Sequence, residues 1–142
     1  MDAAPPQDAD VVVRDRKAVT LLVRNALFTR VRLFAAEKAR ELGELDEEWG
    51  WREPRWRQAM ERFFDEHEEV LLDGDARSSR YLTIDEADER SEHVWHVRQM
   101  FHDADEDDDF GIVGDVDLDA TQDTGEVVFK DLNVGFVEDL RG

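Results

Sequence analysis

The sequence predicts an α+β domain in which a long N-terminal helix and a second helix pack on a curved antiparallel sheet of about four strands. Two patterns lead to this class. In the first half of the chain apolar residues recur at helical intervals, and after Arg80 every second residue tends to be apolar. Because 142 residues suffice for one hydrophobic core, we expect a single domain over residues 14–142, preceded by a flexible leader at 1–13.

The first helix is expected over residues 15–42, which hold neither Pro nor Gly, and Gly43 stands where a C-terminal cap belongs. Its apolar residues form two stripes on nearly opposite sides. The broader stripe is expected in the core. The narrower stripe includes Leu21 and Phe28, seven residues apart, and is either covered by the sheet or left for another protein surface.

A second helix is expected over residues 54–71, and four strands follow it. Pro54 suits the first turn of a helix, and Asp73-Gly74 ends the helical pattern. The polar turns between the later strands are short, so neighbouring strands are expected to be antiparallel. The strands are expected at 81–84, 93–102, 110–120 and 126–137.

One register of the second and third strands aligns the apolar faces of both. It places Trp95 opposite Val116 and His96 opposite Asp115. His96, Arg98 and Asp115 then cluster on one face of the sheet. Acid–base chemistry is one interpretation of this cluster, and a plain solvent-exposed sheet face is the other.

Charge is segregated along the chain. The whole sequence carries a net charge of -19, yet residues 14–40 hold eight Lys or Arg against two acids. Such segregation indicates a surface for an acidic partner such as RNA, or for the acidic remainder of the same molecule. Lys17, Arg24 and Arg32 fall within about one quarter of the helix circumference and can follow a phosphate backbone. Pairing with the domain's own acids is the alternative.

Several functional classes are disfavoured by the composition. No apolar run approaches the ~20 residues of a membrane span, and the N-terminus is acidic where a signal peptide is basic, so we expect a cytoplasmic protein without a membrane partner. The absence of Cys excludes disulfides and Cys-based zinc sites. Because phosphate-binding and nucleophile motifs are also absent, we expect neither ATPase activity nor a cofactor.

The His and acidic residues predict no metal site. Six acids in residues 103–109 are expected to form a solvated loop, with weak divalent-cation binding as the alternative. His67 falls on the apolar stripe of the second helix and is expected to be a hydrogen-bonded core histidine. His96 and His102 would lie about 20 Å apart on one strand. Residues 115–126 resemble a calcium loop but lack its central Gly, which favours strand carboxylates followed by a hairpin turn.

Four stretches of the sequence carry a family resemblance. They are RKAVTLLVRNALFTRV at 16–31, DGDAR at 73–77, WHVRQ at 95–99, and DFGI at 109–112 followed by VDL at 116–118. Over residues 16–137 the chain resembles the domain of unknown function at the C-terminus of actinobacterial DEAD/DEAH-box RNA helicases. The resemblance implies that the ATPase motifs lie in upstream helicase domains and that this domain has no assigned catalytic residues. The plan of two helices and long strands is more loosely similar to the cone-shaped fold of nuclear transport factor 2-like proteins.

Together these observations predict a non-catalytic accessory domain that contacts RNA or helicase core domains, in cis or in trans, through the first helix. The expected contact residues are Lys17, Arg24, Arg32, Leu21 and Phe28. The rival interpretation is a cone-fold enzyme or small-ligand binder with a pocket between helix and sheet. The polar groups expected in that pocket are His96, Arg98 and Asp115.

Overall fold

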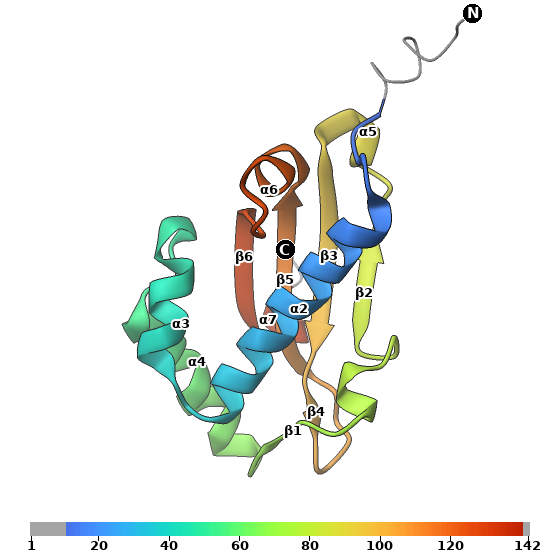
Figure 1. Cartoon of the computed structure of the whole chain (residues 1–142). Coiled ribbons are helices and arrows are strands. Elements are labelled where there is room, and N and C mark those ends of the chain that lie inside the picture. Colours follow the sequence, from blue (N-terminus) through green and yellow to red (C-terminus); the bar gives the residue numbers. More distant parts are fainter. Residues whose placement is uncertain (1–10, 141–142) are drawn as a thin grey trace, which may run out of the picture.

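The computed structural model describes residues 11–140 and confirms the α+β class. A four-stranded antiparallel sheet has the strand order β2-β3-β5-β6, and the long helix α2 crosses one of its faces (Figure 1). Strands β1 and β4 form a separate two-stranded ladder. Helices α3 and α4 pack against each other beside α2 and cover the β6 side of the sheet (Figure 1).

The elements have the following bounds. The helices are α2 (Arg16–Ala35), α3 (Ala39–Asp46), α4 (Glu53–Glu66), α5 (Glu89–Glu92), α6 (Leu118–Thr124) and α7 (Val137–Leu140), with 3-10 turns η1 (Glu47–Trp49) and η2 (Asp75–Arg77). The strands are β1 (Val70–Leu71), β2 (Leu82–Asp85), β3 (Val94–Met100), β4 (His102–Asp103), β5 (Phe110–Asp117) and β6 (Phe129–Phe136).

The expected helix at 15–42 is two helices. Asp15 caps α2 by accepting a hydrogen bond from the Ala18 N–H at 3.0 Å. After Ala35 the chain turns, because Glu37 adopts a φ of 58° and the Lys38 N–H donates to the Leu33 carbonyl. The prediction of one continuous helix was therefore wrong, since a non-glycine residue takes the left-handed conformation that ends α2.

Gly43 does not cap a helix, as the sequence had suggested, but lies inside α3. A Cβ atom at this position would come within 2.5 Å of the Glu53 backbone nitrogen, at the start of α4. The missing side chain thus lets α3 and α4 approach backbone to backbone, and this contact explains a glycine within a helix.

The second helix begins as expected but ends earlier. Pro54 lies in the first turn of α4, and the helix stops at Glu66 instead of residue 71. His67 is extended, with φ -131° and ψ 145°, and Val70–Leu71 then pair with His102–Asp103. Pairing with β4 satisfies backbone groups at 70–71 that a longer helix would have satisfied internally.

The predicted register of the central strands is confirmed. Trp95 lies opposite Val116 and His96 lies opposite Asp115 in the β3–β5 ladder. The ends of the strands differ from the expectation because short helices replace two of the turns. Asp117 caps α6 by accepting from the Ala120 N–H at 3.0 Å, so the expected strand carboxylates and hairpin turn after residue 117 are instead a helix.

The core fills the space between α2, α4 and one face of the sheet. The Phe34 ring of α2 lies 4.8 Å from the Phe101 ring and 5.7 Å from the Phe63 ring of α4. All three side chains are fully buried, and each contributes roughly 1.5–3 kcal/mol by leaving water. The guanidinium of Arg16 lies over the Trp95 ring, which places Trp95 on the face toward α2.

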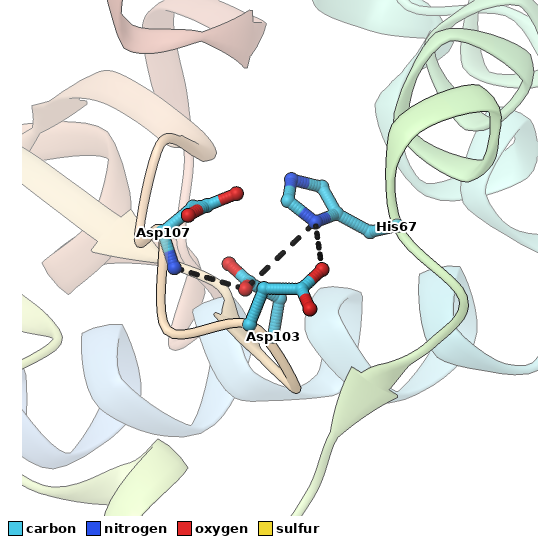
Figure 2. A group of neighbouring side chains, drawn as sticks. His67, Asp103 and Asp107 are labelled. Carbon is cyan, nitrogen blue, oxygen red and sulfur yellow. Dashed lines mark hydrogen bonds and ion pairs between the residues drawn. The ribbon is translucent and has the colours of Figure 1, made fainter.

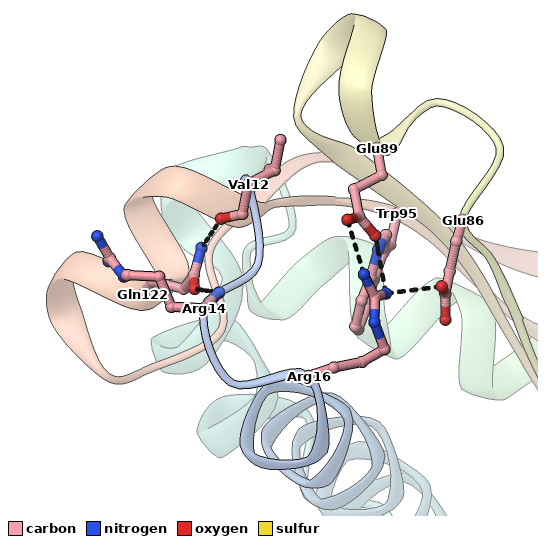
Figure 3. Close-up of polar contacts among 7 residues, drawn as sticks. All are labelled: Val12, Arg14, Arg16, Glu86, Glu89, Trp95 and Gln122. Carbon is pink, nitrogen blue, oxygen red and sulfur yellow. Dashed lines mark hydrogen bonds and ion pairs between the residues drawn. The ribbon is translucent and has the colours of Figure 1, made fainter. Parts of the chain in front are cut away.

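Residues 1–10 of the expected leader lie outside the described residues, but its last residues are part of the fold. Val13 is buried in the core. Gln122 of α6 donates its Nε2–H to the Val12 carbonyl at 2.7 Å and accepts from the Arg14 N–H at 2.9 Å (Figure 3). Val12 and Val13 therefore pack on the rest of the domain.

Candidate functional site

A row of cations follows the solvent face of α2. Lys17, Arg24 and Arg32 are exposed, and Leu21, with 58% of its surface exposed, lies between the first two. Arg77 of η2 joins this row because the Arg24 guanidinium donates to the Arg77 carbonyl at 3.4 Å. We call Lys17, Arg24, Arg32 and Arg77 the basic stripe. Among residues 11–140, no carboxylate oxygen lies within 4.0 Å of its cationic nitrogens.

Phe28 lies beneath the basic stripe instead of on the surface. Only 5% of its surface is exposed. The Arg77 guanidinium carbon is 4.8 Å from the centre of the Phe28 ring and that of Arg32 is 5.6 Å from it. The two cations thus cover the ring through cation–π contacts. Of the two apolar contact residues expected from the sequence, Leu21 is accessible and Phe28 supports the cations.

Other cations of α2 are paired within the domain. Arg16 donates to Glu86 at 2.7 Å and to Glu89 at 2.8 Å, beside the Trp95 ring (Figure 3). Glu89 accepts hydrogen bonds from Arg16 and from the Trp95 indole. These bonds hold the pKa of the Glu89 carboxyl below its ordinary value despite partial burial. Pairing with the domain's own acids, the alternative considered for the whole helix, therefore applies to Arg16.

Arg30 is paired more deeply. Its guanidinium donates to both carboxylate oxygens of Asp46, at 2.6 Å and 3.0 Å, and both side chains are buried. Asp46 also accepts from the Trp49 indole at 2.7 Å. Helix periodicity places Arg30 near the core, but Asp46 lies in a different helix, so the sequence pattern does not reveal this pair.

His96 and Asp115 lie together, as the predicted register requires. The imidazole makes two hydrogen bonds of 2.6 Å, through Nδ1 to Asp115 and through Nε2 to Asp88. The hydrogen bond to Asp115 contributes most, and the one to Asp88 next, to a pKa of His96 that is raised to about 9. His96 is therefore an imidazolium at neutral pH with both nitrogens engaged, and it has no lone pair to act as a general base.

The expected pocket between helix and sheet does not contain these groups. His96, Arg98 and Asp115 line a depression of about 410 Å³ on the sheet face that points away from α2, since Trp95 points toward it. A separate groove of about 460 Å³ does lie between α2, η1 and the α6–β6 loop. Its lining includes Ala26, Arg30, Trp49 and Val128.

His67 is buried, as expected of a core histidine, and its Nε2 is 3.0 Å from Asp109 Oδ1. Its Nδ1 faces the acidic run (Figure 2). Burial lowers the pKa of His67, but the hydrogen bond to Asp109 and the nearby charge of Asp103 outweigh it, so the net direction is upward.

The run 103–109 is not a fully solvated loop. Asp103 is only 1% exposed, because its carboxylate accepts the N–H groups of Asp107 and Asp108, each at 3.0 Å. The expectation of a solvated loop is thus wrong at its first residue, where a buried carboxylate organises the backbone that follows.

None of the helices within residues 11–140 has the length and apolar character needed to cross a membrane. The chain matches no curated protein and no solved structure. A family model does match residues 1–134, and its description is a domain of unknown function (DUF3516).

Proposed function

The chain belongs to the family of the domain of unknown function DUF3516, and we propose that it is a non-catalytic accessory domain of a DEAD/DEAH-box RNA helicase that binds RNA through the basic stripe. The observation that carries the proposal is the lack of acidic partners for the stripe among residues 11–140. The sequence offers 37 acids for 18 bases, so unpaired cations gathered on one surface favour an external acidic partner.

The chemistry of the stripe supports a phosphate partner. Three of its four cations are arginines, whose planar guanidinium can donate two parallel hydrogen bonds to one phosphate. From Lys17 to Arg32 the stripe extends roughly 22 Å along the helix axis. Arg77 and Arg32 are held against the Phe28 ring, which limits the side-chain entropy that they would lose on binding.

The link to a helicase rests on the resemblance of residues 16–137 to the C-terminal domains of actinobacterial helicases. We propose that this domain adds affinity for RNA while the helicase core performs the ATP-dependent step. A small-ligand enzyme is less favoured. His96 has both nitrogens engaged, and the 410 Å³ depression that it lines lies on the outer face of the sheet.

The test is fluorescence anisotropy of a labelled single-stranded RNA titrated with the whole chain at several salt concentrations. We expect saturable binding that weakens with salt, with a slope of log K against log salt of about -3 if all four cations contact phosphates. The double variant Arg24→Glu/Arg32→Glu should lose most of this binding and flatten the slope.

Lys38→Glu/Arg40→Glu is the matched control, because it reverses the same number of charges outside the stripe. The affinity of this control variant for the RNA should stay close to that of the parent chain. An equal loss in both double variants would contradict a defined binding surface. Absent RNA binding at low salt, combined with stripe-dependent docking to helicase core domains, would assign the stripe to a protein partner.

A further inference from the structure

A buried imidazole nitrogen faces a group of carboxylates on the side of the molecule where α4 meets the β4–β5 loop. His67 is 4% exposed, and its Nδ1 has no hydrogen-bond partner among the described residues. This nitrogen lies 3.8 Å from Asp103 Oδ1 and 3.5 Å from Asp105 Oδ2, and it makes a hydrogen bond to neither. An unsatisfied buried nitrogen costs free energy and calls for a partner.

The other ring nitrogen determines what Nδ1 can do. A carboxylate only accepts, so the 3.0 Å contact between Nε2 and Asp109 places a proton on Nε2. In the neutral ring Nδ1 then carries a lone pair, and that lone pair points at the acids. A carboxylate that holds the far side of an imidazole is the usual second shell of a metal-bound histidine.

The acids around Nδ1 come from one stretch of the chain, and the first of them is held in place. Asp103 is buried, and each of its oxygens accepts one N–H and keeps a second lone pair. Asp105 and Asp107 extend the group toward solvent, and Figure 2 shows His67, Asp103 and Asp107 converging on one space. One potential ligand atom from each of these four residues lies within 4.8 Å of the other three.

We propose that His67, Asp103, Asp105 and Asp107 bind a divalent first-row transition-metal ion. Ligand atoms at about 2.0–2.2 Å from one ion lie roughly 3–4 Å from each other, so small rotations of the exposed Asp105 and Asp107 side chains would close the site. One imidazole and three carboxylates suit Mn²⁺ or Zn²⁺ better than Mg²⁺ or Ca²⁺, which favour oxygen ligands alone.

The ion would connect two parts of the chain that are distant in sequence. His67 directly follows α4, whereas Asp103 ends β4 and begins a loop with six acids in seven residues. A bound cation would offset the mutual repulsion of these acids and fix the loop against α4. This site is separate from the basic stripe and shares no residue with it, so the two proposals can fail independently.

The first experiment is calorimetric titration of the chelator-treated whole chain with Mn²⁺ and Zn²⁺, and with Mg²⁺ and Ca²⁺ for comparison. We expect one Mn²⁺ or Zn²⁺ per chain. The Asp105→Asn variant should weaken this affinity at least about tenfold, and Asp109→Asn should weaken it by about 10- to 100-fold through the second shell.

Glu106→Gln is the matched control, since it removes the same charge from the same exposed stretch without removing a proposed ligand. Its affinity should stay within about twofold of the parent chain if the four named residues are the ligands. Equal losses in Asp105→Asn and Glu106→Gln would overturn the site in favour of diffuse attraction to an acidic loop. Binding of Ca²⁺ as tight as that of Mn²⁺ would overturn the role of the imidazole.

Direct detection of the histidine avoids relying on a buried substitution that can impair folding. Electron spin echo spectroscopy of the Mn²⁺-loaded parent chain should show coupling to one imidazole nitrogen. The signal must also persist in a His93→Gln variant, because His93 lies outside the proposed site and its side chain is about half exposed. A spectrum without nitrogen coupling would contradict the proposal.

Discussion

The arginines of α2 occupy two different electrostatic settings, although they lie on one helix. Arg30 is buried and donates to both oxygens of a buried Asp46, whereas Arg24 and Arg32 are exposed and have no carboxylate within 4.0 Å among residues 11–140. Arg16 is intermediate, since it is half-exposed and paired. A basic helix in an acidic chain can therefore use some cations for folding and leave others for a partner.

The largest effect is expected from breaking the buried pair. Asp46→Asn leaves the Arg30 guanidinium buried without a counter-charge, so we expect the free energy of unfolding to fall by about 3–5 kcal/mol. Denaturant-induced unfolding followed by far-UV circular dichroism measures this change. Glu44→Gln, which removes an exposed carboxylate from the same helix, should stay within about 0.5 kcal/mol. A comparable loss of unfolding free energy in Asp46→Asn and Glu44→Gln would contradict the distinction between a buried and an exposed ion pair.

An intermediate effect is expected at Glu89, which accepts hydrogen bonds from Arg16 and from the Trp95 indole. Glu89→Gln should lower the free energy of unfolding by about 1–2 kcal/mol at neutral pH. In the parent chain the pKa of the Glu89 carboxyl is lowered in the folded state. The carboxylate therefore stabilises the fold fully above the ordinary pKa of 4.5, and this stabilisation is lost as the pH falls through the folded-state pKa.

The difference in the free energy of unfolding between Glu89→Gln and the parent chain should therefore become smaller when the measurement is repeated below pH 4.5. Glu86→Gln is the control, since Glu86 is about half exposed and makes one contact with Arg16. Its cost should stay below about 1 kcal/mol. A Glu89 effect that does not change with pH would contradict the assigned charge pairing.

The smallest effect on stability is expected in the basic stripe. Arg24→Gln/Arg32→Gln should change the free energy of unfolding by no more than about 1 kcal/mol, because neither cation has an acidic partner to lose and only the exposed contacts of Arg32 with Phe28 and of Arg24 with the Arg77 carbonyl are removed. The midpoint of thermal unfolding gives a second readout. A loss above about 1 kcal/mol would mean that these arginines stabilise the fold, and it would remove the contrast with Arg30.

Local patterns in the sequence predicted the sheet better than the helix ends. Alternating apolar residues define a face, and one register alone aligned Trp95 with Val116, so the β3–β5 pairing followed from the sequence. The end of α2 could not be predicted in this way. Glu37 takes a φ of 58° without glycine or proline to mark the turn, and the conformation is fixed by hydrogen bonds to earlier carbonyls.

The residues of the candidate sites also differ in whether local sequence patterns could place them. Lys17, Arg24 and Arg32 lie on one helix, so helical spacing placed them on one face. Arg77 joins them only through tertiary contacts, namely its packing on Phe28 and the hydrogen bond from Arg24 to its carbonyl. His67 meets Asp103 for the same kind of reason, because the β1–β4 ladder brings together segments more than thirty residues apart. No local pattern carries that information.

Gly43 has a consequence for any attempt to transplant this pair of helices. The angle at which α3 meets α4 depends on a hydrogen atom where every other amino acid has a carbon, since a Cβ would lie 2.5 Å from a backbone nitrogen. A designer who grafts α3 and α4 onto another scaffold must carry this glycine with them. Conversely, a methyl group at this position is the smallest wedge with which the two helices can be pushed apart.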